Sequence, residues 1–356
     1  MSGSFVITGV GLVSAAGDTP EEVFAAVSAR RPLAGAIEAF DPKRYISRKG
    51  VKDLSRASQL ACAAAAGNAR GLDGVPADQV GVVLGTAWGS LNTVIEFERE
   101  AHVQGARFVD PILFTETVSN VPAGQIAIHY GWSAFNATVS SGSASGLAGL
   151  RQAVQLLEDE RGSVAVAGGC DERNAPVLRT LRQGSAYGEA ACFLTIESDT
   201  YARRRGARQL ARIRGTESGF VPPDQPGSRA KRDAIGVLIR RVTERAGLAL
   251  PDVDLVVSSA GDANDRDGHE AHAILELFGS RAATLPIVAP KSILGETWGA
   301  SGALAVVIAI EAMRTSTVPG ETLTRTMRNA LILDTTDSGH QFGMIVSLVE
   351  PHDAGN

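Results

Sequence analysis

The stretch that decides the expected fold is residues 137–158, because the spacing of apolar side chains changes within it. It begins Ala137-Thr-Val-Ser-Ser-Gly-Ser-Ala-Ser-Gly146 and runs on to Glu158. Thr138 and Val139 are β-branched, which favours a strand. After the small residues, apolar side chains recur at spacings of three and four, at Leu147, Leu150, Val154 and Leu157. The pattern predicts a short strand, a tight turn and a long amphipathic helix.

The turn places Ser143 at the start of this expected helix. Small residues let the backbone approach a neighbour or a ligand closely. The free N–H groups of a first helical turn can stabilise an anion. An activated hydroxyl or thiol at such a position can serve as an acyl-transfer nucleophile, so Ser143 is a candidate site residue.

Composition excludes several other classes of protein. The chain has 356 residues, of which 44% are apolar and 21% charged, as in an ordinary globular protein of one large or two smaller domains. The net charge of −5 and the dispersed Lys and Arg residues argue against a nucleic-acid surface. No run approaches the roughly 18 apolar residues of a membrane span. Met1–Gly3 leads straight into an apolar stretch without a signal-peptide pattern, so we expect a cytoplasmic protein without membrane contact.

No cofactor or metal site is expected. Gly9 and Gly11 lack the third glycine and the helix spacing of a dinucleotide site. His269 and His272 are three residues apart and do not form an H-E-x-x-H motif, so they predict a solvated helix face. The three cysteines are an odd number, lie far apart and have no metal-ligand neighbours, which predicts reduced thiols: Cys62, Cys170 and Cys192.

The turn at Val139-Ser-Ser-Gly-Ser-Ala-Ser-Gly146 resembles the nucleophile turn of the β-ketoacyl synthases, the condensing enzymes of fatty-acid and polyketide assembly. In that family a Cys stands at the position of Ser143. The resemblance covers almost the whole chain, including the apolar segment Phe5–Ser14, the helix start at Ser55–Leu60 and the stretch Asp110–Gln125.

The resemblance implies an α/β, thiolase-like fold with two duplicated βαβαβαββ halves in a five-layer αβαβα arrangement. We expect the halves to be residues 1–205 and 206–356, with a hinge at 201–208. The order of periodic segments agrees, because strand and helix patterns follow one another in the same sequence in both halves. Strands are expected at 5–14, 80–85, 164–170, 190–198, 210–216, 253–259, 285–288, 331–335 and 342–350, and helices at 54–69, 232–248, 268–278 and 299–314.

The family's condensation chemistry needs a nucleophile, two His donors and an oxyanion hole, and the matching positions here have lost them. Ser143 replaces the Cys, and no base for its hydroxyl is evident. Ala260 stands where the first His is expected, after the strand pattern at 256–259. The family's Gly-rich loop corresponds to residues 335–342, which contain one Gly. We therefore expect a framework without its catalytic residues.

The second His position belongs to a K-S-x-x-G-H motif, which here reads Lys291-Ser-Ile-Leu-Gly-Glu296. A carboxylate only accepts hydrogen bonds, so Glu296 is unsuited to stabilising an enolate. The retained Lys291 and Glu296 are expected to form an ion pair with a structural role.

By resemblance, the stretch before the nucleophile strand lies at a dimer interface and reaches toward the partner's acyl tunnel. Its candidate tunnel or interface residues are Leu113, Phe114, Thr117, Val118 and Asn120. The alternative is that each of these side chains only packs a loop against the core.

The resulting hypothesis is a catalytically inactive chain length factor of a type II polyketide system, with a reduced or polyene product. It would form a heterodimer with an active ketosynthase subunit, and an acyl carrier protein would deliver the phosphopantetheine-bound chain. One alternative is an acyltransferase that uses Ser143 on carrier-bound acyl groups, with His340 as the base. Another is a self-dimerising synthase, against which Ala260 and Glu296 argue.

Overall fold

The first half of the chain supplies five strands and the helices that connect them. The computed structural model describes residues 4–47, 49–180, 186–222, 228–261 and 268–349. The elements of the first half are β1 (Phe5–Ser14), α1 (Pro20–Ser28), α2 (Arg56–Ala69), β2 (Val80–Gly85), α3 (Leu91–Gln104), α4 (Pro111–Thr115), α5 (Val121–Tyr130), β3 (Asn136–Val139), α6 (Ser145–Glu158), β4 (Val164–Asp171), α7 (Ala175–Thr180), β5 (Ala190–Ser198) and α8 (Asp199–Arg204).

The second half repeats this plan after a short connection. Its elements are β6 (Ala211–Phe220), α9 (Ser228–Arg245), β7 (Leu255–Val257), α10 (His269–Phe278), β8 (Ile287–Val288), α11 (Lys291–Leu294), α12 (Ser301–Thr315), the short pair β9 (Thr317–Val318) and β10 (Glu321–Thr322), β11 (Asn329–Thr335) and β12 (His340–Leu348).

The sheet topology shows the duplication directly. The strands follow the order β3-β2-β4-β5-β1-β6-β12-β11-β7-β8. In chain order, the sheet strands of the second half are β6, β7, β8, β11 and β12. Each half therefore arranges its first to fifth strands in the order 3-2-4-5-1, counted from the outer edge of the sheet towards the middle. In both halves the second strand is parallel to the third and the fourth, whereas the fifth is antiparallel to its neighbours. The two halves join where β1 pairs with β6 through Phe5–Ile7.

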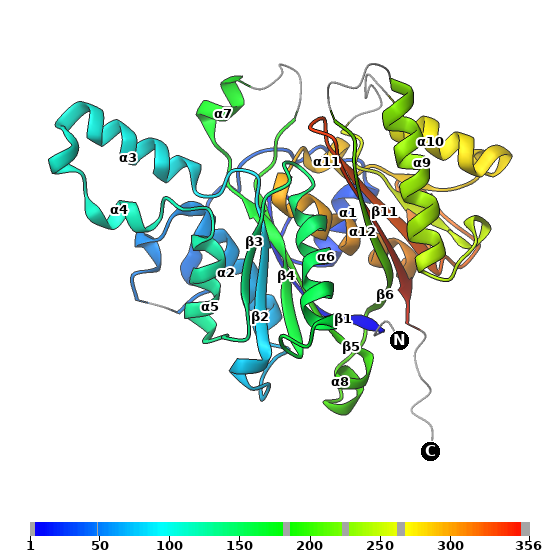
Figure 1. Cartoon of the computed structure of the whole chain (residues 1–356), viewed down its shortest axis with the longest axis horizontal. Helices are drawn as coiled ribbons and strands as arrows, with labels where there is room; N and C mark the ends of the chain where they lie inside the picture. The colour runs from blue at the N-terminus through cyan, green and yellow to red at the C-terminus, as the bar shows by residue number, and fades with distance from the viewer. Residues whose placement is uncertain (1–3, 48, 181–185, 223–227, 262–267, 350–356) are drawn as a thin grey trace.

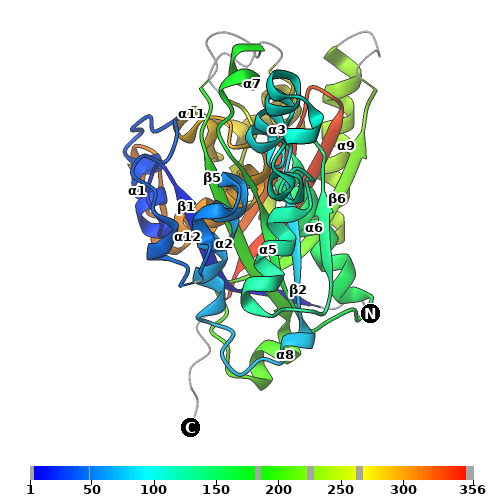
Figure 2. The same ribbon diagram turned by 90° about the vertical axis from the view of Figure 1, so that its left-hand side faces the viewer.

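Buried apolar side chains form three groups within the predicted five-layer arrangement, one under each outer helix layer and one around the central helices. α2 and α5 cover the outer face of the first half-sheet, where Leu60 and Ile126 are buried. α9 and α10 cover the outer face of the second, where Ile239 and Ile274 are buried. α6 and α12 lie between the half-sheets, as Figures 1 and 2 show. Almost every residue of α12 is buried, as expected for a helix enclosed between two sheets.

The apolar patterns located most elements closely. β1, β2 and β5 have the expected bounds, and the helix face at Leu147, Leu150, Val154 and Leu157 is buried. Corrections concern element ends. β7 is shorter than its pattern at 253–259, because strand ends depend on backbone pairing and not only on apolar residues. The expected hinge at 201–208 begins inside α8. The division of the chain at 205/206 stays a prediction.

Candidate functional site

The turn that carries Ser143 lies between the end of β3 and the start of α6. Gly142 adopts a φ of +61°, a left-handed conformation that suits glycine. The Ser145 hydroxyl donates to the Gly142 carbonyl at 2.6 Å and accepts from the Ser141 N–H at 2.9 Å. These two bonds hold the turn, and Ser143 lies immediately before Ala144, the N-cap of α6, close to the predicted place at the helix N-terminus.

The structure brings the four predicted site residues into one pocket of about 180 Å³. Ser143, Ala260, Lys291 and Glu296 all line it. Thr336 and Gly339, from the connection between β11 and β12, line the same pocket. Ser143 and Thr336 are more than 190 positions apart in the chain. They nevertheless line one site, as the family motifs implied.

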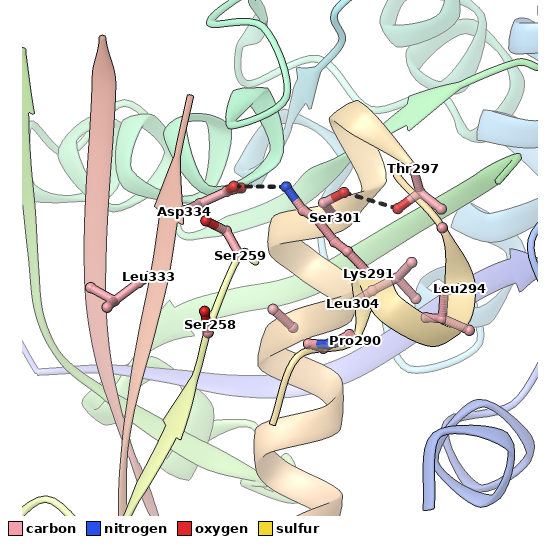
Figure 3. Close-up of a pocket in the computed structure, with 12 residues that line it drawn as sticks. Ser258, Ser259, Pro290, Lys291, Leu294, Thr297, Ser301, Leu304, Leu333 and Asp334 are labelled. Carbon is pink, nitrogen blue, oxygen red and sulfur yellow. Dashed lines mark hydrogen bonds and ion pairs between the residues drawn. The ribbon is translucent and has the colours of Figure 1, made fainter. Parts of the chain in front are cut away.

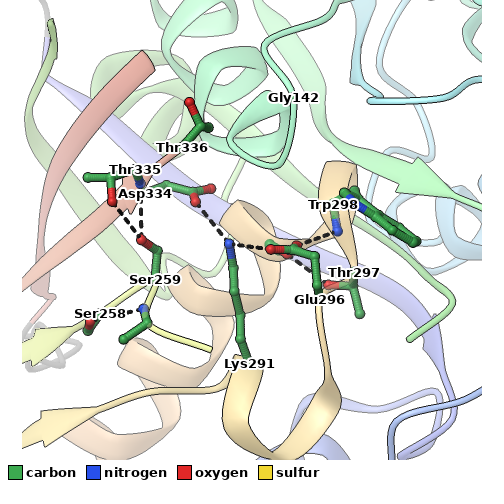
Figure 4. A network of polar contacts seen from close by, with 12 residues as sticks. Gly142, Ser258, Ser259, Lys291, Glu296, Thr297, Trp298, Asp334, Thr335 and Thr336 are labelled. Carbon is green, nitrogen blue, oxygen red and sulfur yellow. Dashed lines mark hydrogen bonds and ion pairs between the residues drawn. The ribbon is translucent and has the colours of Figure 1, made fainter. Parts of the chain in front are cut away.

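Lys291 and Glu296 form the expected ion pair, with Nζ 2.9 Å from Oε2 of Glu296 (Figure 4). The second partner of the ammonium was not predicted. Asp334, at the end of β11, places Oδ1 at 3.2 Å from the same Nζ. The Glu296 Oε1 atom accepts from the Trp298 N–H at 2.7 Å and from the Ser301 hydroxyl at 2.8 Å. The Glu296 carboxylate is thus fully engaged in holding its own surroundings.

Two carboxylates share one ammonium in this cluster, and all three groups are largely buried. Burial by itself would lower the pKa of the Lys291 ammonium, but Asp334 and Glu296 outweigh burial and raise it. Burial raises the pKa of Asp334 to about 7, although the Lys291 charge opposes this shift. Lys291 is therefore a permanent cation and not a nucleophile, because an amine attacks only when it is deprotonated.

A small cavity beside the Lys291 stem has a volume of about 10 Å³, and Leu294, Leu304 and Leu333 line it (Figure 3). This volume is at the lower limit for a single water molecule, about 10–15 Å³. No acyl chain can lie there.

Glu270 forms a second polar group of the site that sequence reasoning missed. Its carboxylate accepts from the Ser258 hydroxyl at 2.6 Å and the Thr335 hydroxyl at 2.6 Å, and also from the N–H and hydroxyl of Ser259. Glu270 is buried at the start of α10 and shares a helix face with Ala273 and Ile274. A glutamate on an apolar helical face was the available signal for a buried, bonded carboxylate.

Asp171 is a third missed residue, and it ties three segments together at the end of β4. Its buried carboxylate accepts from the Thr86 hydroxyl at 2.7 Å and from the N–H groups of Ala87, Trp88 and Gly299 at 2.8–2.9 Å. Burial raises its pKa to about 6, and these hydrogen bonds oppose the shift. No signal in the sequence joined Asp171 to positions 86–88 and 299.

The histidines correct two expectations. His269 lines the pocket with Ser143, so only His272 of this pair lies on an exposed helix face. His340 is not among the lining residues, and its ring packs on Phe220 at 5.1 Å. The base suggested for Ser143 is therefore in the wrong place. Within the described ranges, no group of His, Cys, Asp and Glu is arranged to hold a metal ion.

Of the five candidate interface residues, Leu113 and Phe114 lie on α4, and Thr117, Val118 and Asn120 lie in the connection from α4 to α5. α3 and α4 form an arm that projects from the first half of the chain (Figure 1). Phe114 is 61% exposed and packs on Phe97 of α3, and Val118 is also exposed. Leu113, Thr117 and Asn120 are half-buried or exposed. Their role at an interface stays a prediction. No helix among the described residues is long and apolar enough to cross a bilayer.

Solved structures with the same fold include the ishigamide ketosynthase/chain length factor. The two chains share 23% identity with a TM-score of 0.86, covering 98% of this chain and 100% of the other. A β-ketoacyl synthase from Burkholderia phymatum STM815 has 22% identity and a TM-score of 0.84 over the same shares. A type II PKS acyl-carrier protein complex with its ketosynthase, bound to the hexaketide, has 18% identity and a TM-score of 0.82, again over 98% and 100%. At these identities the likeness establishes the fold.

Curated relatives include two named 3-oxoacyl-[acyl-carrier-protein] synthase 2. The protein from Coxiella burnetii is 24% identical over 358 residues, which covers 88% of this chain and 86% of that one. The protein from Mycobacterium tuberculosis is 29% identical over 275 residues, which covers 69% of this chain and 64% of that one.

Two family models match consecutive parts of the chain. Residues 45–184 match the β-ketoacyl synthase N-terminal domain, and residues 210–323 match the β-ketoacyl synthase C-terminal domain. The matched segments follow the two halves of the fold and together make up more than half of the chain. The chain therefore belongs to the β-ketoacyl synthase family.

Proposed function

We propose that this chain is a catalytically inactive chain length factor. It pairs with an active ketosynthase subunit and bounds the acyl-chain tunnel while an acyl carrier protein delivers the growing chain of a type II polyketide. The fold it shares with the ishigamide ketosynthase/chain length factor supports this class of assembly.

The observation that carries the proposal is that the Glu296 carboxylate lies in the pocket, paired with Lys291. Enolate stabilisation requires hydrogen-bond donors aimed at the developing negative charge. Glu296 instead places a carboxylate in the pocket, and the Lys291 ammonium is already neutralised by Glu296 and Asp334. The Glu296 carboxylate would repel an enolate, and the Lys291 ammonium is already paired with two carboxylates.

Two further positions support the loss of condensation chemistry. Ala260 has only a methyl group in the same pocket and can donate no proton. The Ser143 hydroxyl has no hydrogen-bond partner within the described part of the chain. Without an acceptor for its proton, a serine hydroxyl is a weak nucleophile at neutral pH.

The partner would cover the arm formed by α3 and α4. Exposed apolar side chains gather on the arm and at its foot: Val103, Phe108, Ile112, Phe114 and Val118. Apolar and aromatic residues of this kind are enriched in the buried centres of protein interfaces. The proposal places the ketosynthase on this surface, with Phe114 at the tunnel.

Co-expression with candidate ketosynthases, followed by native mass measurement of the purified complex, tests the proposal. We expect a one-to-one heterodimer that elongates malonyl units on an acyl carrier protein. The isolated chain should give no extension product, and Ser143→Ala should leave the activity of the heterodimer unchanged. Malonyl-dependent extension by the isolated chain would overturn the proposal.

One observation favours an alternative, an acyltransferase that uses Ser143. His269 lines the same pocket and brings an imidazole to the site that sequence reasoning had assigned to His340. This function predicts an acyl adduct on Ser143 in intact mass spectra after incubation with an acylated carrier protein. The adduct should disappear in both Ser143→Ala and His269→Ala. Full product formation by the heterodimer containing Ser143→Ala would exclude it.

A further inference from the structure

The arm formed by α3 and α4 projects from the molecule and buries almost nothing (Figure 1). Thr93 is the one buried residue of the 14 in α3, and α4 has none. Both helices are fully described, and neither contributes a side chain to the three groups of buried apolar residues. A helix of about 14 residues is marginally stable in water unless it packs an apolar face. Contacts other than core packing must therefore hold the arm in place.

The chain enters and leaves the arm at one place. Gly89 lies just before α3, and a Cβ on it would lie 3.0 Å from the Cα atom of Ser119, beyond the end of α4. Ser90, the N-cap of α3, places its hydroxyl 3.0 Å from the hydroxyl of Ser55, the N-cap of α2. The arm is therefore a closed excursion of the chain, and its two ends meet beside the start of α2.

Glu116 fixes the outgoing end of the arm, directly after α4. Its side chain is buried, and its Oε2 atom accepts from the N–H of Ser55 at 3.1 Å and from the hydroxyl of Ser58 at 2.8 Å. Its Oε1 atom accepts from the side-chain amide of Gln125, on α5, at 2.9 Å. One carboxylate thus joins the end of α4 to both helices that cover the first half-sheet.

Glu172 fixes the ingoing end from the residue that follows β4. It is fully buried, and its Oε1 atom accepts from the N–H of Asn92, in the first turn of α3, at 2.8 Å. The side chain of Ser90 makes no cap bond to α3, so Glu172 supplies the acceptor that an N-cap residue normally gives. Burial raises the pKa of Glu172 to about 7, so at pH 8 its charge also stabilises the positive end of α3.

We propose that Glu116 and Glu172 are the positioning residues of the arm, and that the arm opens as a separate unit when either carboxylate is lost. The inference rests on the proposed function for what the arm meets. Its exposed apolar side chains, Phe108, Ile112 and Phe114, are presented to the ketosynthase in one orientation, because both ends of the arm are anchored. Fixing that orientation before binding lowers the entropic cost of association.

Hydrogen–deuterium exchange of the isolated chain at pH 8 tests the anchoring without a partner. The amides of α3 should exchange faster than those of α6, since regions with few buried contacts open at a lower free energy. Glu116→Ala and Glu172→Ala should each raise the exchange rates of residues 91–115 at least about tenfold and leave α6 unchanged, because each leaves a buried N–H without its acceptor. Glu116→Gln keeps an acceptor for Ser55 and should restore most of the protection.

Glu311→Ala is the matched control. Glu311 lies on the central helix α12, is 7% exposed against 5% for Glu116, and pairs with Arg314. Its loss removes an equally buried glutamate away from the ends of the arm. Exchange of residues 91–115 in Glu311→Ala should therefore match that of the natural chain.

Titration of each variant with the ketosynthase then measures the effect on association. Glu116→Ala and Glu172→Ala should each raise the dissociation constant about tenfold, whereas Glu311→Ala should not. Unchanged exchange of the arm in both folded alanine variants would contradict the inference. So would variants with an accelerated arm that bind the ketosynthase as tightly as the natural chain does. If the natural chain binds no ketosynthase, the proposed function fails, and the exchange rates still decide whether the two glutamates hold the arm.

Discussion

Replacing Lys291 by Met should destabilise the chain strongly, because it leaves two buried carboxylates without their shared cation. The Lys291 side chain is 9% exposed and that of Asp334 is 3% exposed, and their charged atoms lie 3.2 Å apart. Removing one partner of a buried ion pair costs about 3–5 kcal/mol, since the remaining charge is left uncompensated. Urea denaturation at pH 8 should show a loss of unfolding free energy in this range for Lys291→Met.

The loss should depend on pH in a defined direction. Burial raises the pKa of Asp334 from 3.8 to about 7, so the folded chain binds this proton more tightly than the unfolded chain. Such a carboxyl costs stability as the pH rises from about 4 to 7. Without Lys291 the pKa should rise further and carry the cost above pH 7, by at most about 1.4 kcal/mol per pH unit. The destabilisation of Lys291→Met relative to the natural chain should therefore be larger at pH 8 than at pH 6.

A matched control is available in the same pocket. Lys231 also lines this pocket, but its Nζ is exposed and makes one long hydrogen bond, of 3.5 Å, to the Asp337 carbonyl. Lys231→Met should change the unfolding free energy by no more than about 0.5 kcal/mol. The reasoning fails if Lys291→Met costs less than about 1 kcal/mol at pH 8 or costs the same at pH 6.

Three further predictions concern other parts of the molecule. Phe114→Ala should let the heterodimer make longer products by mass spectrometry, and unchanged products from an intact complex would remove Phe114 from the tunnel. Asp171→Asn offers an NH₂ group to donors that need an acceptor, so thermal and urea denaturation should show a loss of at least about 2 kcal/mol. Gly299→Ala would place a Cβ 2.3 Å from the Gly85 carbonyl oxygen, so it should cost about 3 kcal/mol or more and give mainly insoluble protein; wild-type yield would contradict this contact.

Much of the fold was accessible from local patterns. β2 is an uninterrupted apolar run that ends in glycine, and it has its predicted bounds because all six residues are buried. α1 begins at a Thr-Pro-Glu-Glu pattern, and its capping box at Thr19 and Glu22 forms as such sequences favour. These features depend on residues within a few positions of one another, so the chain reveals them without its partners in space.

The site was only partly accessible for the same reason. Lys291 and Glu296 are five residues apart and belong to one motif, so their ion pair could be predicted. Asp334 is 43 residues from Lys291, and its place in the cluster follows from the position of β11 in the sheet. His340 was assigned to the pocket because its loop reaches the site, but its ring packs on Phe220 instead.

The sequence by itself predicted the layered α/β architecture and the turn that carries Ser143, and both are confirmed; the loss of the family's catalytic side chains, which the resemblance implies, stays a prediction. Apolar periodicity and motif spacing are local properties and are written in the order of residues. Only the tertiary structure decided that Trp88, Trp298 and Tyr187 stand together, and that Asp171 and Glu296 hold the backbone beneath them. These contacts join chain segments that meet only after both half-sheets have formed, and no local pattern encodes which side chains will meet there.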